Sequence, residues 1–210
     1  MNKTSRVLSA AAAVLLSAVY VFPLWRISLL APQYPEGLGM LIRVNTVEGV
    51  KEFDLVNINQ LNHYIGMKLI DPLSIPELKY FPWVVAGLVA SGLVVAAWGK
   101  RALLYGWAAM FATAAGLGFW DFWRWTYDYG HNLDVENAII KVPGAIYQPP
   151  IIGVRQILNF TASSWPGAGG IAAMVAFGMV VLAVVLTLRD RRDPAARAVR
   201  AAHPAPLVAE

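Results

Sequence analysis

The chain has 210 residues, of which 58% are hydrophobic, and its formal net charge is +4. It contains no cysteine, which excludes disulfides, thiolate metal sites and haem attached through cysteine. It also lacks a P-loop, a nucleophile elbow, a zinc-protease motif and a dinucleotide fingerprint. No common nucleotide-binding or hydrolase class is therefore indicated.

Four long apolar segments follow one another along the chain. They cover residues 7–24, 81–98, 102–120 and 170–188, and none of them contains a charged side chain. Each is close to the roughly 17–25 residues that a helix needs to cross the hydrocarbon core of a bilayer. We predict four transmembrane helices. The absence of charge inside the spans argues against an ion transporter or channel.

Glycines within two of these spans are expected to allow close helix contacts, inside the bundle or with a partner. They are Gly87, Gly92, Gly106, Gly116 and Gly118.

The distribution of basic residues predicts the orientation. The two tails and the turn Lys100–Arg101 carry nine Lys and Arg with three acids, whereas the long loops and Arg26 carry eight with ten acids. Basic residues in short segments favour the cytoplasm, so both termini should be cytoplasmic and both long loops should be outside, as in a multi-pass protein of a bacterial inner membrane. A cleavable secretory signal is the alternative for the first span. Its length and its lack of a small-residue cleavage site favour an uncleaved helix.

The two outer loops cover residues 32–80 and 121–168. In the first, residues 40–47 and 50–55 are β-prone on either side of the turn Glu48-Gly49, which predicts a β-hairpin. Residues 57–66 then predict a short helix, with Asp54 or Asn57 as its N-cap and Gly66 at its end.

In the second outer loop, the aromatic run 120–130 should continue the third span outward as a helix that ends at Gly130. Residues 154–160 are expected to form a short interfacial helix before the fourth span. Each loop is too short to bury a core alone, so the two should pack on each other. The expected fold is an all-α membrane protein with a small extracytoplasmic α+β cap. Residues 1–190 form one domain and residues 191–210 a disordered cytoplasmic tail.

One constellation could bind a metal in these outer loops. His63 and Met67 are four residues apart, and packing of the loops could bring His131 to them, with Met40 as a fourth member. Imidazole and thioether donors suit copper better than calcium or magnesium. The alternative is structural, with His63 as a hydrogen-bonding loop residue and Met67 buried in core or lipid.

A charged face on the outward helix is a second candidate. The spacing of Asp121, Arg124 and Asp128 places an acid, a base and an acid on one side of the helix. This face could be a relay or docking point, or it could be a structural ion-pair network. Arg26 and Glu36 are the expected partners.

Four segments resemble a small family of bacterial four-span membrane proteins encoded in nitrous oxide reductase gene clusters, near a copper-chaperone lipoprotein and an ABC-type maturation system. The resemblance covers about residues 1–190. The segments are Ala31-Pro-Gln-Tyr-Pro-Glu-Gly-Leu38, Leu61-Asn-His-Tyr-Ile-Gly-Met67, Tyr127-Asp-Tyr-Gly-His-Asn-Leu133 and Tyr147-Gln-Pro-Pro-Ile-Ile-Gly153.

The resemblance implies a non-enzymatic accessory protein that assists maturation or copper supply of an exported metalloenzyme. It strengthens the expectation that copper, if any cofactor, binds at His63, Met67 and His131. The rival hypothesis is a structural subunit or anchor whose cap docks an electron-transfer complex on the extracytoplasmic face and binds no metal. An enzyme using Asp128 and His131 as an acid–base pair is a third interpretation, and no nucleic-acid partner is indicated.

Overall fold

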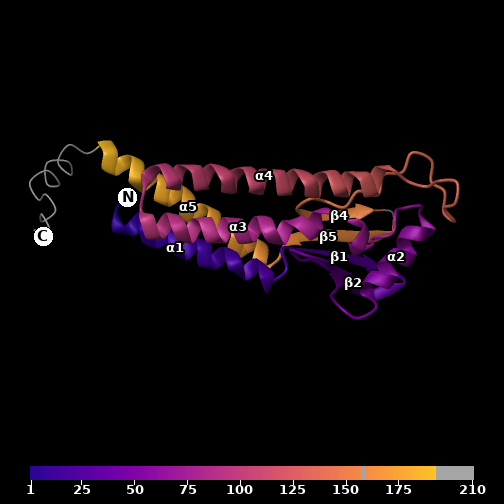
Figure 1. The fold of residues 1–210 in the computed structure, drawn as a ribbon. Helices are drawn as coiled ribbons and strands as arrows, with labels where there is room; N and C mark the ends of the chain where they lie inside the picture. Colours follow the sequence, from indigo (N-terminus) through magenta and orange to yellow (C-terminus); the bar gives the residue numbers. More distant parts are fainter. Residues whose placement is uncertain (158, 193–210) are drawn as a thin grey trace, which may run out of the picture.

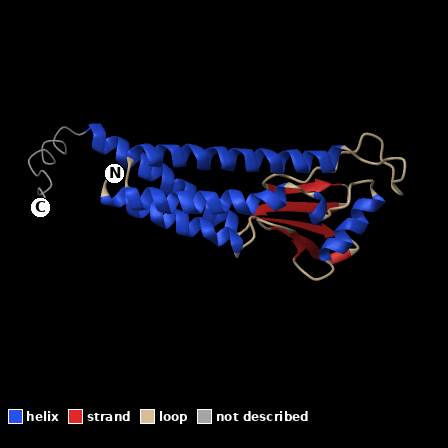
Figure 2. Cartoon of the chain, viewed as in Figure 1, coloured by secondary structure: helices blue, strands red, loops and turns tan. Residues whose placement is uncertain are grey.

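The computed structural model describes residues 1–157 and 159–192. The molecule has two parts, a bundle of long helices and a sheet-containing cap at one end of it (Figures 1 and 2). The helices are α1 (Lys3–Leu16), α2 (Asp54–Tyr64), α3 (Glu77–Trp98), α4 (Arg101–His131) and α5 (Ala168–Arg192), with short 3₁₀ helices η1 (Ser17–Tyr20) and η2 (Pro72–Ser74). The strands are β1 (Trp25–Ala31), β2 (Tyr34–Ile42), β3 (Val47–Gly49), β4 (Gly153–Ile157) and β5 (Phe160–Pro166).

Three of the described helices are long and apolar enough to cross a membrane: Glu77–Trp98, Arg101–His131 and Ala168–Asp190. The first expected span is different, because its α-helix has 14 residues and continues as η1 only to Tyr20. Four spans are therefore not confirmed by helix length. α1 nevertheless packs against α3 and α5, and Ala12, Ala13 and Leu16 are buried in the shared core.

The expected glycine contacts divide into two groups. A Cβ on Gly92 would overlap the ring of Trp107, and a Cβ on Gly118 would overlap Phe81, so these two glycines do allow close packing. At Gly87, Gly106 and Gly116 a Cβ would meet nothing within 4 Å. These three make no close contact within the described chain, which corrects the expectation for contacts inside the bundle.

The cap is built on a five-stranded antiparallel sheet with the order β3-β2-β1-β5-β4. A hairpin forms in this region, but it is not the expected one: β2 and β3 flank residues 43–46, so Glu48-Gly49 belongs to a strand and not to the turn, and residues 50–55 form no strand. β2 also pairs with β1. The interfacial helix expected at 154–160 is wrong, since β4 and β5 occupy that region. Pairing with β1, far away in sequence, overrides the local preference there. The all-α class is thus not confirmed.

One face of the sheet carries the core of the cap. Ile27, Leu38 and Met40 pack there against Ile58 of α2 and Tyr129 of α4. α4 has 31 residues, or about 46 Å at ~1.5 Å per residue, so it exceeds a ~30 Å hydrocarbon core and its outer end can cover the sheet. The predicted outward continuation of the third span is confirmed, although the helix ends at His131 instead of Gly130.

The sheet is joined tightly to the bundle. The backbone N–H of Gly167 donates to Leu24 O at 3.0 Å, and that of Gly169 donates to Pro23 O at 2.9 Å. A Cβ on Gly170 would lie 2.2 Å from Leu24 O, so only glycine fits there. The cap and α5 therefore meet through direct backbone contact. Residues 193–210 of the expected tail lie outside the described residues, and 191–192 end α5.

Candidate functional site

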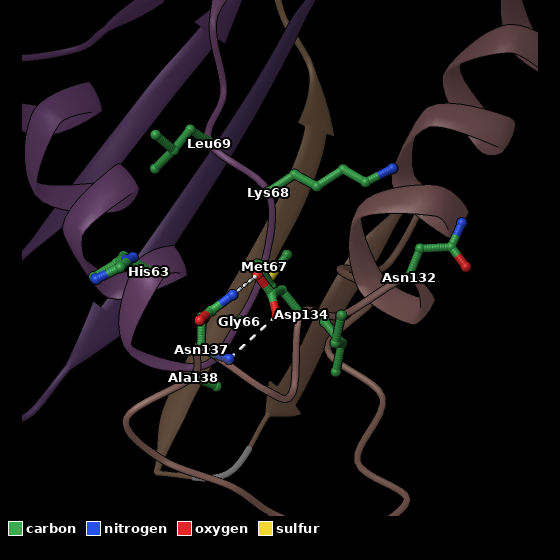
Figure 3. A pocket seen from close by; sticks show the side chains of 10 residues that line it. His63, Gly66, Met67, Lys68, Leu69, Asn132, Asp134, Asn137 and Ala138 are labelled. Atoms are coloured by element: carbon green, nitrogen blue, oxygen red, sulfur yellow. Dashed lines mark hydrogen bonds between the residues drawn. The ribbon is translucent and has the colours of Figure 1, made fainter.

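The outer loops pack on each other, as predicted, and a hollow of about 580 Å³ lies between them. One wall consists of residues 63–69 at and after the end of α2, and the other consists of residues 132–138 after α4. Figure 3 shows His63 on the α2 side and Asn132 on the α4 side. Segments that are about 70 residues apart in sequence thus form one site.

The first wall begins where α2 stops. The N–H of Gly66 donates to His63 O at 3.4 Å and the N–H of Met67 donates to Asn62 O at 2.8 Å. With φ of +75° at Gly66, this is a Schellman ending, so the expected helix stop at Gly66 is confirmed. Met67 consequently lies just beyond the helix, four residues after His63. Neither expected N-cap is correct, because Asp54 is the first residue of α2, Asn57 lies within the helix and Phe53 is at the N-cap position.

The second wall is tied to the first by backbone hydrogen bonds. The N–H of Asp134 donates to Gly66 O at 2.8 Å, and the N–H of Ile140 donates to Tyr64 O at 2.8 Å. A Cβ on Gly66 would lie 2.6 Å from Asp134 O, so the contact requires glycine. The sequence pattern predicted Gly66 only as a helix end and did not indicate this contact.

Within the second wall, the carboxylate of Asp134 accepts hydrogen bonds from the backbone and side-chain amides of Asn137, at 3.2 and 2.8 Å. The side-chain bond from Asn137, followed by the backbone one, lowers the pKa of Asp134 because both stabilise the charged carboxylate. The dashed lines in Figure 3 mark these bonds. Asp134 is therefore an ionised turn-forming residue.

The structure brings together two of the four predicted metal ligands. His63 and Met67 both line the hollow. His131 does not line it: its ring stacks on Tyr127 at 3.8 Å between centroids, and its Nδ1 lies 3.0 Å from Tyr127 O. Because a carbonyl only accepts, Nδ1 is the donor in this arrangement. Met40 is buried in the sheet core and does not line the hollow either.

Of the predicted ligands, only His63 and Met67 therefore line the hollow, and Met67 also packs against the apolar clusters of the cap, as the structural alternative expected. Among the residues that the structure describes, no three His, Asp or Glu side chains converge in a way that could hold a metal ion. A soft ion bound to His63 and Met67 alone would need further ligands from elsewhere.

The charged face of α4 forms three ion pairs, in two separate groups. Arg124 contacts Asp121 and Glu77, both at 2.7 Å, and Asp128 contacts Lys68 at 2.6 Å. The expected partners are wrong, because Arg26 donates to Ser28 and Glu36 pairs with Lys51 on the sheet. The pair between Lys68 and Asp128 fixes the first wall against α4, as does the bond from Tyr129 OH to Leu69 O at 3.0 Å.

Three of the four segments that carry the family resemblance meet at this place. Residues 61–67 and 127–133 contribute to the walls or their supports, and the segment 147–153 is attached by the N–H of Tyr147, which donates to Gly130 O at 2.9 Å. No protein-family model matches the chain, and no curated protein matches it either.

Proposed function

We propose that this protein is a non-enzymatic membrane accessory protein that presents a fixed exterior cap to an exported metalloenzyme. The observation that carries the proposal is the hollow with His63 and Met67 between two outer loops, on a cap in direct backbone contact with its membrane anchor. Such a cap positions a docking surface at a constant height above the bilayer. The resemblance to the family of nitrous oxide reductase gene clusters suggests that enzyme as the partner.

The anchor in this proposal has four spans with both termini in the cytoplasm of a bacterium. α1 and η1 together extend about 29 Å at ~1.5 and ~2.0 Å per residue, which approaches the ~30 Å of a hydrocarbon core. At the end opposite to the cap, Arg6 donates to Ala96 O and Ala97 O at the end of α3, so a basic residue lies where the positive-inside rule places it.

Cysteine labelling tests this orientation. A cysteine that replaces Lys141 should react with a membrane-impermeant maleimide in cells whose outer membrane alone is opened. A cysteine that replaces Lys3 should react only after the inner membrane is permeabilised. The reverse pattern would contradict the orientation.

In the copper hypothesis, the same hollow is the place from which Cu(I) is transferred to a partner. His63 and Met67 are soft donors, and two donors hold a Cu(I) ion less firmly than a complete site, which suits delivery to a partner that supplies the missing ligands. Since a protonated imidazole cannot coordinate, acid should weaken binding.

A Cu(I) competition titration of the purified protein in detergent tests this hypothesis. His63→Ala and Met67→Leu should each weaken Cu(I) binding about tenfold or more, because each removes one of two donors. Leu69→Ala changes an exposed side chain of the same wall without removing a soft donor or an ion pair, and serves as the matched control. Equal Cu(I) affinity in wild type and His63→Ala would remove the copper role and leave a structural subunit or anchor, whose cap docks an electron-transfer complex, as the better description.

A further inference from the structure

The end of the helix bundle opposite to the cap carries a group of basic side chains. α1 and α4 begin at this end and α3 ends there (Figure 1). The chain segments 1–35 and 78–120, which contain these three helix ends, have no Asp or Glu. We call the group the end cluster; it consists of Lys3, Arg6, Lys100 and Arg101.

Arg6 is the member of the end cluster that the structure fixes in place. Its guanidinium donates to Ala96 O at 2.8 Å and to Ala97 O at 2.7 Å, in the last turn of α3. A Cβ on Gly99, the left-handed residue after α3, would lie 3.1 Å from the Cδ of Arg6, so the side chain lies close over this glycine. A guanidinium has five N–H donors, and these bonds use two of them. Arg6 therefore keeps donors for an anion in a fixed position.

The other three cations belong to the same surroundings. Lys3 precedes Arg6 by three residues on α1, so both lie on one side of that helix. Lys100 and Arg101 directly follow Gly99, which the Arg6 side chain contacts. Lys3, Arg6 and Lys100 are exposed, and Arg101 is partly buried. The cluster is thus open to a ligand from outside.

The charge of the end cluster is not balanced by the protein. In the described part of the chain, the ion pairs all lie in the cap or where α3 and α4 meet it, and none includes a member of the cluster. At the same end, α5 adds Arg189 and Asp190, whose charges cancel. Four positive charges therefore remain for an external anion.

The end cluster lies where a bilayer has its phosphate groups. α3 has 22 residues, or about 33 Å at ~1.5 Å per residue, which matches a ~30 Å hydrocarbon core. When this helix crosses a membrane, its end at Trp98 lies in the headgroup layer, and Trp98 is 68% exposed, as is typical of aromatic side chains at that level. Lys100 and Arg101 follow within three residues. This placement is the same for either orientation of the chain.

We propose that the end cluster binds the phosphate of an anionic phospholipid. Arg6 donates its remaining N–H groups to phosphate oxygens, and Lys3 and Lys100 add positive charge that favours a headgroup with a net negative charge. A zwitterionic phospholipid binds less tightly, because its own ammonium group offsets the charge of its phosphate. This site is separate from the hollow and does not depend on the proposed function.

Native mass spectrometry of the full chain measures this binding, with phosphatidylglycerol added to a neutral detergent and phosphatidylcholine as the reference lipid. The end variant combines Lys3→Gln with Lys100→Gln. The matched control combines Arg26→Gln with Lys79→Gln, which removes two exposed cations from β1 and the first turn of α3, at the opposite end of the bundle. The two variants have the same net charge. Because all four side chains are exposed, both variants should keep the thermal stability of the wild type.

We expect the wild type to bind phosphatidylglycerol about tenfold or more tightly than phosphatidylcholine. The end variant should bind phosphatidylglycerol about tenfold more weakly than the wild type, and the control should bind it as the wild type does. Equal binding of the two lipids by the wild type, or equal weakening in both variants, would overturn the site. Displacement of phosphatidylglycerol by an equal concentration of glycerol phosphate would overturn the assignment of a lipid in favour of a free phosphate.

Discussion

The bundle and the cap hold their polar groups in different ways. In the bundle, buried hydroxyls bond to neighbouring helices: Ser5 Oγ donates to Ala183 O at 3.1 Å and Thr187 Oγ1 lies 3.0 Å from Ser5 Oγ. In the cap, a carboxylate that is 3% exposed, that of Asp54, accepts from the backbone N–H groups of Gly39 and Lys51 at 2.9 and 3.1 Å. Every ion pair in the described part of the chain lies in the cap or where α3 and α4 meet it.

This difference reflects what surrounds each part. A helix within a bilayer satisfies its own backbone, so its association depends on small residues and a few hydroxyl bonds. The cap has irregular backbone outside the bilayer core and no disulfide, so its loops need side-chain and backbone bonds between distant segments. The cap should therefore be more sensitive than the bundle to loss of a single polar contact or of a close backbone approach.

The largest effect is expected at Asp54, which joins the start of α2 to β2. Asp54→Ala would leave one buried and one partly buried backbone N–H group without an acceptor, which costs about 2–3 kcal/mol of cap stability. Thermal unfolding of the protein in detergent, followed by tryptophan fluorescence, measures the change because Trp25 and Trp125 belong to the core of the cap.

Asp54→Asn is the matched variant, since its amide oxygen can still accept while the charge is lost. It should cost about 1 kcal/mol. If Asp54→Ala were no worse than Asp54→Asn, the carboxylate would not organise the cap, and the contrast with the bundle would fail there.

A smaller loss of stability is expected in α4, which has one end in the cap and the rest in the bundle. Gly130 lies at the cap end of α4, and a Cβ there would be 2.3 Å from the Cα of Gln148. Gly130→Ala should therefore displace the segment around Tyr147 and cost about 1–3 kcal/mol. Gly116→Ala, in the same helix, should cost nothing because a Cβ meets no atom within 4 Å.

Unfolding midpoints of the two alanine variants, measured in parallel in the same detergent, provide the comparison. Greater sensitivity to proteolysis in residues 133–147 should accompany Gly130→Ala alone. A destabilised Gly116→Ala variant would instead show that the outer surface of α4 is covered in the purified protein.

The sequence alone determined what depends on nearby residues. The apolar runs at residues 81–98 and 170–188 predict long helices because a helix satisfies its backbone locally and needs only length and composition to cross a bilayer, and long helices cover both runs in the structure. The end of α2 at Gly66 and the outward continuation of α4 follow from local signals in the same way.

Only the tertiary structure decided what depends on distant partners. β4 and β5 became strands because β1, more than 130 residues earlier, offers a ladder to pair with, and no local pattern shows this. The same holds for the site. Gly66 approaches Asp134 and Lys68 pairs with Asp128 because the two loops pack on each other. By contrast, the His131 ring stacks on Tyr127, and Met40 is buried in the core of the cap. The sequence supplied these side chains and their chemistry, but their neighbours were set by the packing of the cap.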